Sequence, residues 1–304
     1  MDDRLKVLVL MGGPDRERGV SLKSGAAIAA ALRQAGHTVT EGDINPDDDS
    51  ALRSTDAQVV FPALHGRFGE GGALQRMLDA RRLPYVGSRA SPSAVAIDKV
   101  ATKRIAEKHR VPTPPYQFLG ATTELTLPFP LVVKPLTEGS TYGVEVCRDA
   151  GAAAAARTRQ HAHYAFLMAE TFIAGREVTV GILGDEPLPV VEIRPEGGFY
   201  DFHAKYESDR TRYLLDEETG LPGQVLERLK GAALKVHREI GCRHLSRSDF
   251  MVDSDNGVWF LEINTLPGFT DHSLFPMAAR RIGLEMPALC DRLVRMALRD
   301  GLGR

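Results

Sequence analysis

Two carboxylates, an amide and an arginine alternate with apolar residues near position 250 of the chain. The stretch from Arg247 to Leu274 reads RSDFMVDSDNGVWFLEINTLPGFTDHSL and contains the dipeptide Asn256-Gly257 between two apolar-rich segments. Asn-Gly is a strong signal for a tight turn between antiparallel strands, so we expect a β-hairpin here. If the turn has two central residues, odd positions of the first strand lie opposite even positions of the second.

This pairing sorts the side chains of the hairpin onto two faces. The polar face collects Arg247, Asp249, Glu262 and Asn264, and the apolar face collects Phe250, Val252, Trp259, Leu261 and Ile263, interrupted by Ser248. The apolar face must be directed into a core. Oxygen ligands such as those on the polar face suit Mg²⁺, with phosphates and water supplying the remaining ligands. The alternative is a solvated sheet face whose arginine and carboxylate pairs contribute ~0.2 to 1 kcal/mol each.

A tight loop is expected directly after the second strand, at Pro267-Gly268. An exposed backbone N–H at Gly268, next to Arg247 and a metal, would stabilise developing negative charge. An ordinary turn is the alternative interpretation.

A second group of polar residues follows the predicted strand that ends at Lys134. The next residues include Glu138-Gly139-Ser140-Thr141-Tyr142-Gly143, a loop bounded by glycines and rich in hydroxyls. Backbone N–H groups of such a loop can approach a phosphate closely while the lysine supplies a positive charge. The loop is not a Walker loop, because the lysine precedes the glycines. A mobile hairpin loop is the alternative.

Three further features carry weaker signals. The aromatic segment from Phe199 to Tyr206 includes Lys205 and lies in a long loop, so it could close over a site and exclude water, or it could be fixed by aromatic packing. His65 follows a strand end, where sheets of this class place ligand-binding loops. Glu17 could bind a substrate ammonium or pair with a neighbouring arginine.

The composition limits the kind of protein that carries these residues. A chain of 304 residues favours two or three domains, and 43% apolar with 26% charged residues is ordinary for a globular protein. The net charge of −2 gives no basic excess for nucleic acid or a membrane surface, so we expect small-molecule partners. The apolar run from Leu5 to Met11 is too short for a signal peptide or a membrane span. Cys147, Cys242 and Cys290 are scattered, which indicates reduced thiols in a cytoplasmic protein without a zinc site.

The N-terminal part is expected to be a small α/β unit with a parallel sheet. Strands are predicted over residues 5–10, 38–43 and 58–63, helices over 21–36 and 73–82, and a short strand and turn over 83–87. Gly12-Gly13 follows the first strand, but the G-x-G-x-x-G spacing of a dinucleotide site is missing.

The rest of the chain is expected to form two further domains. Ser91-Pro92-Ser93 opens a single helix that carries Lys99 and ends near His109. An α+β lid domain then has strands over 129–134, 144–147 and 164–170 and an alanine-rich helix over 150–160. Strands over 176–182 and 190–193, a helix over 224–240, the hairpin, and helices over 277–282 and 287–298 complete the chain. Residues 195–223 are polar without periodicity and predict a functional or disordered loop. The predicted domains are 1–90, 91–175 and 176–304.

The order and spacing of these motifs resemble the D-alanine:D-alanine ligases of the ATP-grasp superfamily over nearly the whole chain. The matching stretches are GGPDRERGVSLKSG, ALHGRFGEGGALQ, LPYVGS followed by Asp98-Lys99, VVKP with EGSTYGV, FYDFHAKY, and LEINTLPGFTDHSLFPMAAR, the most specific of them. The resemblance implies a mixed α/β and α+β protein, with an ATP-grasp fold behind an N-terminal α/β domain that has a parallel sheet. It also suggests a cytoplasmic homodimer.

The activity that the resemblance implies is the ATP-dependent joining of two D-alanine molecules to D-alanyl-D-alanine for peptidoglycan precursor synthesis. The γ-phosphoryl group of ATP would pass to the carboxylate of one D-alanine, and the amine of the second would attack the resulting acylphosphate. ATP and two Mg²⁺ or Mn²⁺ ions are the implied cofactors, and D-alanine and ATP are the implied small-molecule partners.

The resemblance also implies a role for each matching residue. The implied nucleotide contacts are Lys99, Lys134, Glu138, Ser140, Glu170, Ile173, Glu177 and Lys205. Glu17, linked to Ser140 and Tyr206 and flanked by His65, would bind the ammonium of the first D-alanine. Arg247 and the Gly268 N–H would form the oxyanion site, and Ser273 with Leu274 would bind the second carboxylate. Asp249, Glu262 and Asn264 would be the metal ligands.

The sequence departs from the family pattern at a few positions. Gly19 and Gly71 replace acidic residues, Thr171 replaces a lysine beside the adenine, and Ser248 replaces an apolar residue. Leu214-Leu215-Asp216 stands where a Cys-Pro pair is common. None of these changes removes a metal-binding or phosphate-binding residue, so activity is still expected.

Two other functions are compatible with these motifs. A different carboxylate–amine ligase would use the same ATP site on another acid, and a panel of substrates would distinguish it. A nucleotide-binding protein without turnover is disfavoured, because Arg247, Asp249, Glu262 and Asn264 are all present.

Overall fold

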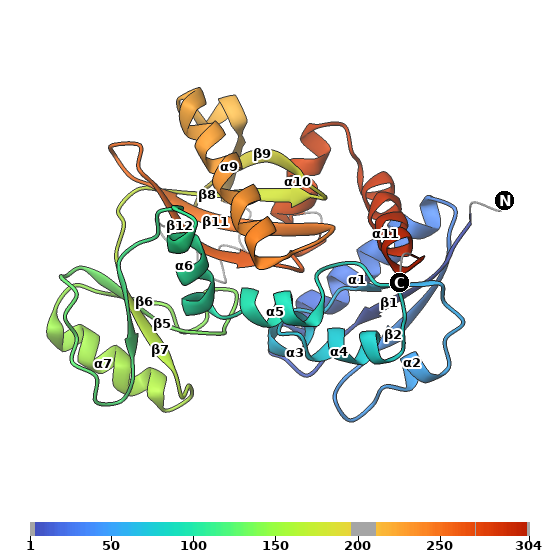
Figure 1. Cartoon of the computed structure of the whole chain (residues 1–304), viewed down its shortest axis with the longest axis horizontal. Helices are drawn as coiled ribbons and strands as arrows, with labels where there is room; N and C mark the ends of the chain where they lie inside the picture. The colour runs from blue at the N-terminus through green and yellow to red at the C-terminus, as the bar shows by residue number, and fades with distance from the viewer. Residues whose placement is uncertain (1–3, 196–210, 271, 303–304) are drawn as a thin grey trace.

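The computed structural model describes residues 4–195, 211–270 and 272–302. Within these ranges the strands form three separate sheets, each built from one stretch of the chain (Figure 1). Each sheet falls inside one of the predicted domain ranges, while the domain boundaries themselves stay a prediction. The mixture of a parallel sheet with antiparallel sheets agrees with the expected mixed fold class.

The N-terminal sheet is parallel, with strand order β2-β1-β3. Its strands are β1 (Lys6–Met11), β2 (Thr38–Asp43) and β3 (Val59–Pro62), and its helices are α1 (Arg18–Gln34), α2 (Ser50–Arg53), α3 (Gly66–Glu70) and α4 (Ala73–Ala80). Alternate residues of β1 enter two different cores. Val7 and Val9 pack in the cluster that contains Ile28, whereas Leu8 and Leu10 pack in the cluster that contains Leu74. Because both faces are covered, the strand is a continuous apolar run, as parallel strands usually are.

The central sheet is antiparallel, with strand order β4-β7-β5-β6. Its strands are β4 (Tyr116–Leu119), β5 (Leu131–Pro135), β6 (Glu145–Cys147) and β7 (Leu167–Thr171). The alanine-rich helix α7 (Ala150–His161) covers one face, where Ala153 and Ala156 pack against Val133. On the other face Met168 packs against Val100, so this sheet contacts the helix that begins at Lys99.

The C-terminal sheet is antiparallel, with strand order β10-β9-β8-β11-β12. Its strands are β8 (Arg176–Leu183), β9 (Glu186–Arg194), β10 (Arg212–Leu215), β11 (Leu245–Val252) and β12 (Val258–Asn264). Helix α9 (Gly223–Ile240) covers one face. Residues of α10 (Leu274–Arg281) and α11 (Met286–Leu302) pack in the same core as residues of β1 and α1 (Figure 1). The end of the chain therefore joins the C-terminal sheet to the N-terminal one.

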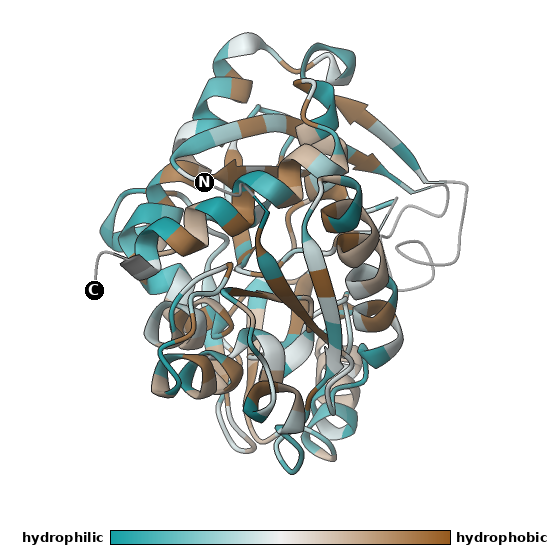
Figure 2. Cartoon of the chain, turned by 90° about the vertical axis from the view of Figure 1, so that its right-hand side faces the viewer, coloured by the Kyte–Doolittle hydropathy of each residue, from teal (hydrophilic) through white to brown (hydrophobic). Residues whose placement is uncertain are grey.

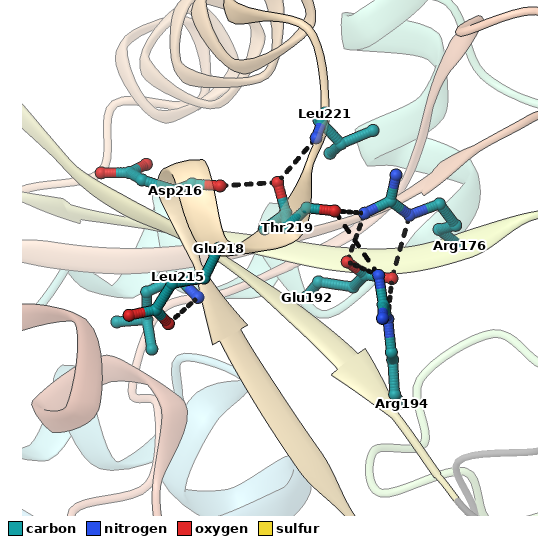
Figure 3. Close-up of polar contacts among 8 residues, drawn as sticks. All are labelled: Arg176, Glu192, Arg194, Leu215, Asp216, Glu218, Thr219 and Leu221. Atoms are coloured by element: carbon teal, nitrogen blue, oxygen red, sulfur yellow. Dashed lines mark hydrogen bonds and ion pairs between the residues drawn. The ribbon is translucent and has the colours of Figure 1, made fainter.

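A buried carboxylate on β9 joins this sheet to the short 3-10 helix η1 (Asp216–Thr219). Figure 3 shows Arg176 and Arg194 directed at Glu192, with both guanidinium groups also reaching the carbonyl of Thr219. Burial would raise the pKa of Glu192, but the hydrogen bonds from the two arginines outweigh it and leave the pKa below its usual value. This network fixes the end of β9.

The single helix predicted from Ser91 to His109 is wrong, because the chain forms two helices there. They are α5 (Ala90–Ala96) and α6 (Lys99–Lys108). Asp98 lies between them with an extended backbone, and its Oδ1 accepts hydrogen bonds from the N–H groups of Val100 and Ala101 at 2.9 and 3.0 Å. An aspartate at this position satisfies donors that the first turn of a helix leaves unpaired, so it starts a new helix.

The two-residue hairpin turn is also wrong. The last pair before the turn is Val252 with Val258, which leaves a loop of residues 253–257, and a β-bulge lies between Asp249 and Phe250. The apolar face predicted for the hairpin changes accordingly. Phe250, Val252 and Ile263 are buried as expected, together with Ser248, but Val258 and Phe260 take the places expected for Trp259 and Leu261, which are only half-buried.

Residues 195–223 were expected to have no regular structure, and part of that expectation is wrong. Residues 196–210 lie outside the described part of the chain, but β10 and η1 follow at Arg212–Leu215 and Asp216–Thr219. β10 is a strand because its backbone pairs with β9, and its own sequence shows no periodicity that would indicate this. The elements α2, α3 and β4 were not predicted either, because they have only four or five residues and too little periodicity to be recognised.

The apolar residues are concentrated inside the molecule. In Figure 2 the strands in the interior are mainly brown, whereas the outer helices carry teal faces. Among the residues described, no helix is both long enough and apolar enough to cross a membrane.

Candidate active site

A cleft forms where segments from all three sheets meet. The predicted site residues that line it are Glu17, His65, Lys99, Glu138, Ser140, Glu177, Arg247, Asp249, Glu262, Asn264, Gly268, Ser273 and Leu274. They come from the loop before α1, the end of β3, the start of α6, the loop after β5, the strands β8, β11 and β12, and the segment that leads into α10. Most of the residues that the sequence analysis selected are therefore brought together.

The polar face of the hairpin forms one wall of the cleft, as predicted. Arg247 lies opposite Asn264 and Asp249 lies opposite Glu262 in the antiparallel ladder. The guanidinium of Arg247 donates two hydrogen bonds to the carboxylate of Asp249, at 2.8 and 3.0 Å. Such a bidentate pair fixes the orientation of both side chains.

The donor set of this wall suits a magnesium ion that is also bound by phosphate and water. Asp249 and Glu262 supply carboxylate oxygens, and Asn264 supplies an amide oxygen that accepts the N–H of Leu266 at 2.8 Å. Within the described ranges, no group of three or more histidine, cysteine, aspartate or glutamate residues could bind a metal. A magnesium ion with few protein ligands is the usual case at phosphate-transfer sites, so these three residues fit the ion.

Lys99 reaches the same wall from the first turn of α6. Its Nζ lies 3.1 Å from Glu262 Oε2 and donates to the carbonyl of Glu138 at 2.6 Å. The side chain is buried, and the cap at Asp98 sets where α6 begins and so where this lysine enters the cleft. A lysine beside a carboxylate that fits a metal ion is well placed to bind phosphate oxygens.

The loop after β5 brings the central sheet to the N-terminal residues of the site. Ser140 and Thr141 have φ angles of 49° and 64°, in the left-handed region that residues with a Cβ rarely adopt. The hydroxyl of Ser140 donates to Oε1 of the buried Glu17. Strained backbone of this kind is common in ligand-binding loops, and here it places the Ser140 hydroxyl at Glu17.

His65 lies beside Glu17 and has two side-chain partners. Its Nδ1 is 3.2 Å from Glu70 Oε1, and its Nε2 is 3.3 Å from the hydroxyl of Ser24, which also accepts the backbone N–H of Phe269 at 3.4 Å. Burial opposes protonation of His65, but the carboxylates of Glu70 and Glu17 outweigh it and raise the pKa of the imidazole. The two carboxylates therefore stabilise the protonated imidazole against the effect of burial.

The segment after β12 forms the floor of the cleft at Gly268, Ser273 and Leu274. A Cβ on Gly268 would lie 2.9 Å from the Ser273 hydroxyl, so this position has no room for a side chain. The Ser273 hydroxyl accepts the N–H of Thr270 at 2.8 Å, which closes the turn at the start of α10. The turn therefore places a glycine backbone and a serine hydroxyl side by side.

Some predicted site residues lie elsewhere. Lys134 and Glu170 are buried, form an ion pair with each other and do not line the cleft, and Ile173 does not line it either. Their contact with a nucleotide stays a prediction. Lys205 and Tyr206 lie outside the described residues.

Two charged residues at the site were not predicted. Glu70 lines the cleft and is the partner of His65, and the buried Lys103 bonds to Glu170. Spacing could have revealed Lys103, because it lies four residues after Lys99 and so on the same side of α6. The sequence shows no comparable signal for Glu70.

Comparisons with known proteins agree with this arrangement. The family described as "D-ala D-ala ligase C-terminus" matches residues 103–295, and "D-ala D-ala ligase N-terminus" matches residues 43–88. The D-alanine–D-alanine ligase of Syntrophotalea carbinolica is 43% identical over 292 residues, which cover 95% of each chain. That of Bordetella avium is 43% identical over 298 residues, which cover 94% of this chain and 92% of the other.

Solved structures extend the likeness to the fold. A crystal structure of D-alanine–D-alanine ligase from Bacillus anthracis complexed with ATP superposes with a TM-score of 0.86, at 30% identity and with 99% of both chains covered. The D-alanine–D-alanine ligase from Coxiella burnetii, at 24% identity, shares the fold with a TM-score of 0.83. The matching family pattern spans more than half of the chain, and relatives over 40% identical cover almost all of it. This chain therefore belongs to the D-alanine–D-alanine ligase family and has its ATP-grasp fold.

Proposed function

We propose that this protein is an ADP-forming ligase that joins two D-alanine molecules into D-alanyl-D-alanine for peptidoglycan precursor synthesis, using ATP. The observation that carries the proposal is the single cleft in which the Arg247, Asp249, Glu262 and Asn264 face of the hairpin meets Glu17 and Ser140. One side of this cleft offers oxygen ligands and cations for a nucleotide and its metal. The other side offers a buried carboxylate for an amine.

The hairpin wall and Lys99 are proposed to hold the nucleotide phosphates. Asp249, Glu262 and Asn264 would bind one or two Mg²⁺ or Mn²⁺ ions, which when bound neutralise phosphate charge during phosphoryl transfer. In the structure Lys99 is paired with Glu262 and Arg247 with Asp249, so each cation already lies beside a proposed metal ligand. Glu138, Glu177 and Ile173 are proposed further nucleotide contacts, together with Lys134, Glu170 and Lys205.

The amine of the first D-alanine is proposed to bind at Glu17. Its carboxylate is buried and is oriented by the hydroxyl of Ser140, so an ammonium group placed there gains a charge-assisted hydrogen bond away from water. His65, whose pKa is raised, lies beside it and would favour a negatively charged group on the substrate. Tyr206 is proposed to complete this set by its resemblance to the family.

Arg247 and the N–H of Gly268 are proposed to stabilise the oxyanion that forms when the second amine attacks the acylphosphate. Both line the same cleft, and one such donor typically contributes ~3 to 4 kcal/mol to lowering the barrier. Ser273 and Leu274 at the start of α10 are proposed to bind the carboxylate of the second D-alanine. The Ser273 hydroxyl accepts the Thr270 N–H and lies 2.9 Å from the Thr270 hydroxyl, so its proton can be donated to a carboxylate when the Thr270 hydroxyl is the donor of that pair.

The proposal includes a cytoplasmic location and a homodimer. Cys147, Cys242 and Cys290 are all free thiols, which supports a reducing compartment. The homodimer rests on the family resemblance. Light scattering during size-exclusion chromatography should give twice the 33.2 kDa mass of the chain, and a mass of one chain would contradict this part.

A panel of substrates tests the proposed reaction. Purified protein is incubated with ATP and Mg²⁺ in three separate reactions. The first contains D-alanine, the second L-alanine, and the third D-lactate together with D-alanine. The products are identified by mass. We expect D-alanyl-D-alanine as the main product and little product with L-alanine. A different main product would identify another carboxylate–amine ligase, and the absence of ADP release with every acid would exclude a ligase altogether.

A further inference from the structure

Lys103 is a completely buried lysine that the proposed reaction does not yet use. It lies on α6, has no exposed surface and is not part of the cleft lining. Its Nζ is 2.8 Å from Glu170 Oε2 and 2.6 Å from the Thr113 hydroxyl, and it also donates to the carbonyl of Phe260 at 3.4 Å. A buried ammonium is unfavourable unless it is paired and hydrogen-bonded, so these contacts must hold it in place.

The partners of Lys103 come from three different parts of the site. Glu170 is on β7 of the central sheet, Phe260 is on β12 next to the metal-binding face, and Lys103 itself is four residues from Lys99 on α6. The ring of Tyr116 on β4 lies 5.6 Å from the ammonium. The Lys103 side chain therefore connects α6, the central sheet and β12, the strand that carries Glu262.

Glu170 shares its carboxylate between two lysines. Lys103 contacts Oε2 and Lys134 contacts Oε1, and all three side chains are buried. Burial would raise the pKa of Glu170, but the charges of Lys103 and Lys134 outweigh it and lower the pKa. Burial lowers the pKa of Lys103 to about 8, with Lys134 adding repulsion against the attraction of Glu170. One negative charge thus faces two positive charges, which is one cation more than neutrality requires.

The excess cation matters because Lys134 is one of the lysines proposed to contact the nucleotide. When the Lys134 ammonium moves from Glu170 to a phosphate oxygen, Glu170 loses one of its two counter-charges. If Lys103 were absent, this step would leave a buried carboxylate without any cation, so Lys134 would stay bound to Glu170. With Lys103 present, the carboxylate keeps a partner.

We propose that Lys103 is a positioning residue for nucleotide binding, which keeps Glu170 in place and charge-compensated so that Lys134 can exchange Glu170 for a phosphate of ATP. This inference rests on the proposed function in taking ATP as the nucleotide and Lys134 as one of its phosphate contacts. It assigns to Lys103 no contact with substrate.

Isothermal titration of the full-length protein with ATP and Mg²⁺, without D-alanine, tests the inference independently of turnover. Lys103→Met should weaken ATP binding at least tenfold, while the KM for D-alanine in the ligase assay should stay within twofold. Lys108→Met is the matched control, because Lys108 is an exposed lysine on the same helix, and it should stay within twofold in both measurements. ATP affinity within twofold of wild type in a folded Lys103→Met protein would overturn the proposal.

A double-mutant cycle separates charge compensation from general damage to the fold. In a Glu170→Gln background no buried carboxylate needs a cation, so adding Lys103→Met should change ATP affinity less than threefold. An equal loss in both backgrounds would overturn the proposal. If Lys103→Met does not fold, Thr113→Val replaces it, since this change removes the neutral partner of the ammonium at 2.6 Å. It should weaken ATP binding at least threefold, and unchanged binding would again contradict the inference.

The role of Lys103 and the ligase activity can be refuted separately. Wild-type protein that makes dipeptide while Lys103→Met binds ATP normally would remove only the role of Lys103. Wild-type protein that binds ATP with the predicted dependence on Lys103, but makes no dipeptide, would remove only the ligase assignment.

Discussion

Asp249 of β11 lies directly opposite Glu262 of β12, and both carboxylates face the cleft. Each is already paired with a cation, Asp249 with Arg247 and Glu262 with Lys99. The pairing keeps two nearby carboxylates compatible before a metal binds, because each has its own counter-charge. Arg247 and Lys99 then remain in the cleft, where they are proposed to bind the oxyanion and the phosphates.

Removing one of the proposed metal ligands should nearly abolish activity. Glu262→Ala leaves Asp249 and Asn264 as the only protein ligands on the hairpin, so we expect ADP formation to fall at least about 100-fold and the Mg²⁺ concentration for half-maximal rate to rise. Steady-state ADP release over a Mg²⁺ titration measures both. Glu285→Ala, which changes an exposed carboxylate paired with Arg280, is the control and should behave as wild type. Unchanged Mg²⁺ dependence in Glu262→Ala would refute the metal assignment.

Arginine at position 247 should not be replaceable by lysine. A lysine cannot make the two parallel hydrogen bonds that Arg247 donates to Asp249, and its ammonium would not reach the oxyanion in the same orientation. We expect Arg247→Lys to lower kcat by on the order of 100- to 1000-fold, which is the usual loss of an oxyanion donor. Arg238→Lys, at an exposed arginine paired with Asp185, provides the comparison. A kcat within a few-fold of wild type would mean that Arg247 does not touch the reacting atoms.

A side chain at position 268 should block the proposed second-substrate pocket. The Cβ of Gly268→Ala would lie 2.9 Å from the Ser273 hydroxyl, so either the turn or Ser273 must move. We expect a rise of at least about tenfold in the KM for D-alanine with a smaller change in the KM for ATP, because the nucleotide side of the cleft is built from other elements. Gly283→Ala has no neighbour within 4 Å of its Cβ but has a φ of +79°, so it reports the effect of backbone strain alone. Equal changes in both KM values would argue against a local effect at this pocket.

Replacing Ser248 by alanine should make the protein more stable. Ser248 is completely buried between Arg247 and Asp249 but on the opposite face of β11, and its hydroxyl has no hydrogen-bond partner among the described residues. Leaving a buried hydroxyl unpaired costs about 1 to 3 kcal/mol. Ser248→Ala should therefore raise the free energy of unfolding by up to that amount, measured by denaturant titration. A lower free energy of unfolding would show that the hydroxyl has a stabilising partner.

Two buried histidines should make the fold sensitive to acid. Burial lowers the pKa of His244 and of His237 to about 4, against an ordinary value near 6.5. The unfolded chain then binds protons that the folded chain does not, so stability is full above about pH 6.5 and falls as the pH drops towards 4. For His244 the loss amounts to about 3 kcal/mol. Its Nδ1 accepts the N–H of Gly87 at 3.1 Å, a bond that only the unprotonated nitrogen can make.

Unfolding free energies at several pH values between 7 and 4 measure this effect. His244→Gln should give a shallower decline than wild type, and His163→Gln, at an exposed histidine, should give the same decline as wild type. Identical slopes for wild type and His244→Gln would contradict the assignment of this acid sensitivity to His244.

The polar face of the hairpin could be predicted because side chains alternate along a strand, and this periodicity survives uncertainty in the turn. The length of the turn could not be predicted. The loop of residues 253–257 shifts the pairing by one residue relative to a two-residue turn, and the β-bulge at Asp249/Phe250 shifts it back. The two deviations cancel at Asp249 and Glu262 but not at Trp259, which explains why the polar face was predicted correctly and the apolar face only in part.

Other parts of the site depend on contacts that no local pattern encodes. The spacing places Lys103 on the same side of α6 as Lys99, but its burial and its pairing with Glu170 depend on the packing of α6 against β12 and the central sheet. The bond between Ser140 and Glu17 joins positions 123 residues apart, so the sequence could suggest it only through family resemblance. Asp98, by contrast, is a recognisable helix start, because aspartate is a preferred N-cap residue, although the apolar pattern alone favours one longer helix.

The stoichiometry of the reaction distinguishes a dipeptide-forming ligase from other uses of ATP. ADP and D-alanyl-D-alanine are measured together in one reaction of the purified protein with ATP, Mg²⁺ and isotopically labelled D-alanine. We expect one ADP to be formed and two labelled D-alanine molecules to be consumed for each dipeptide. ADP formed without dipeptide, or no ADP above background, would contradict it.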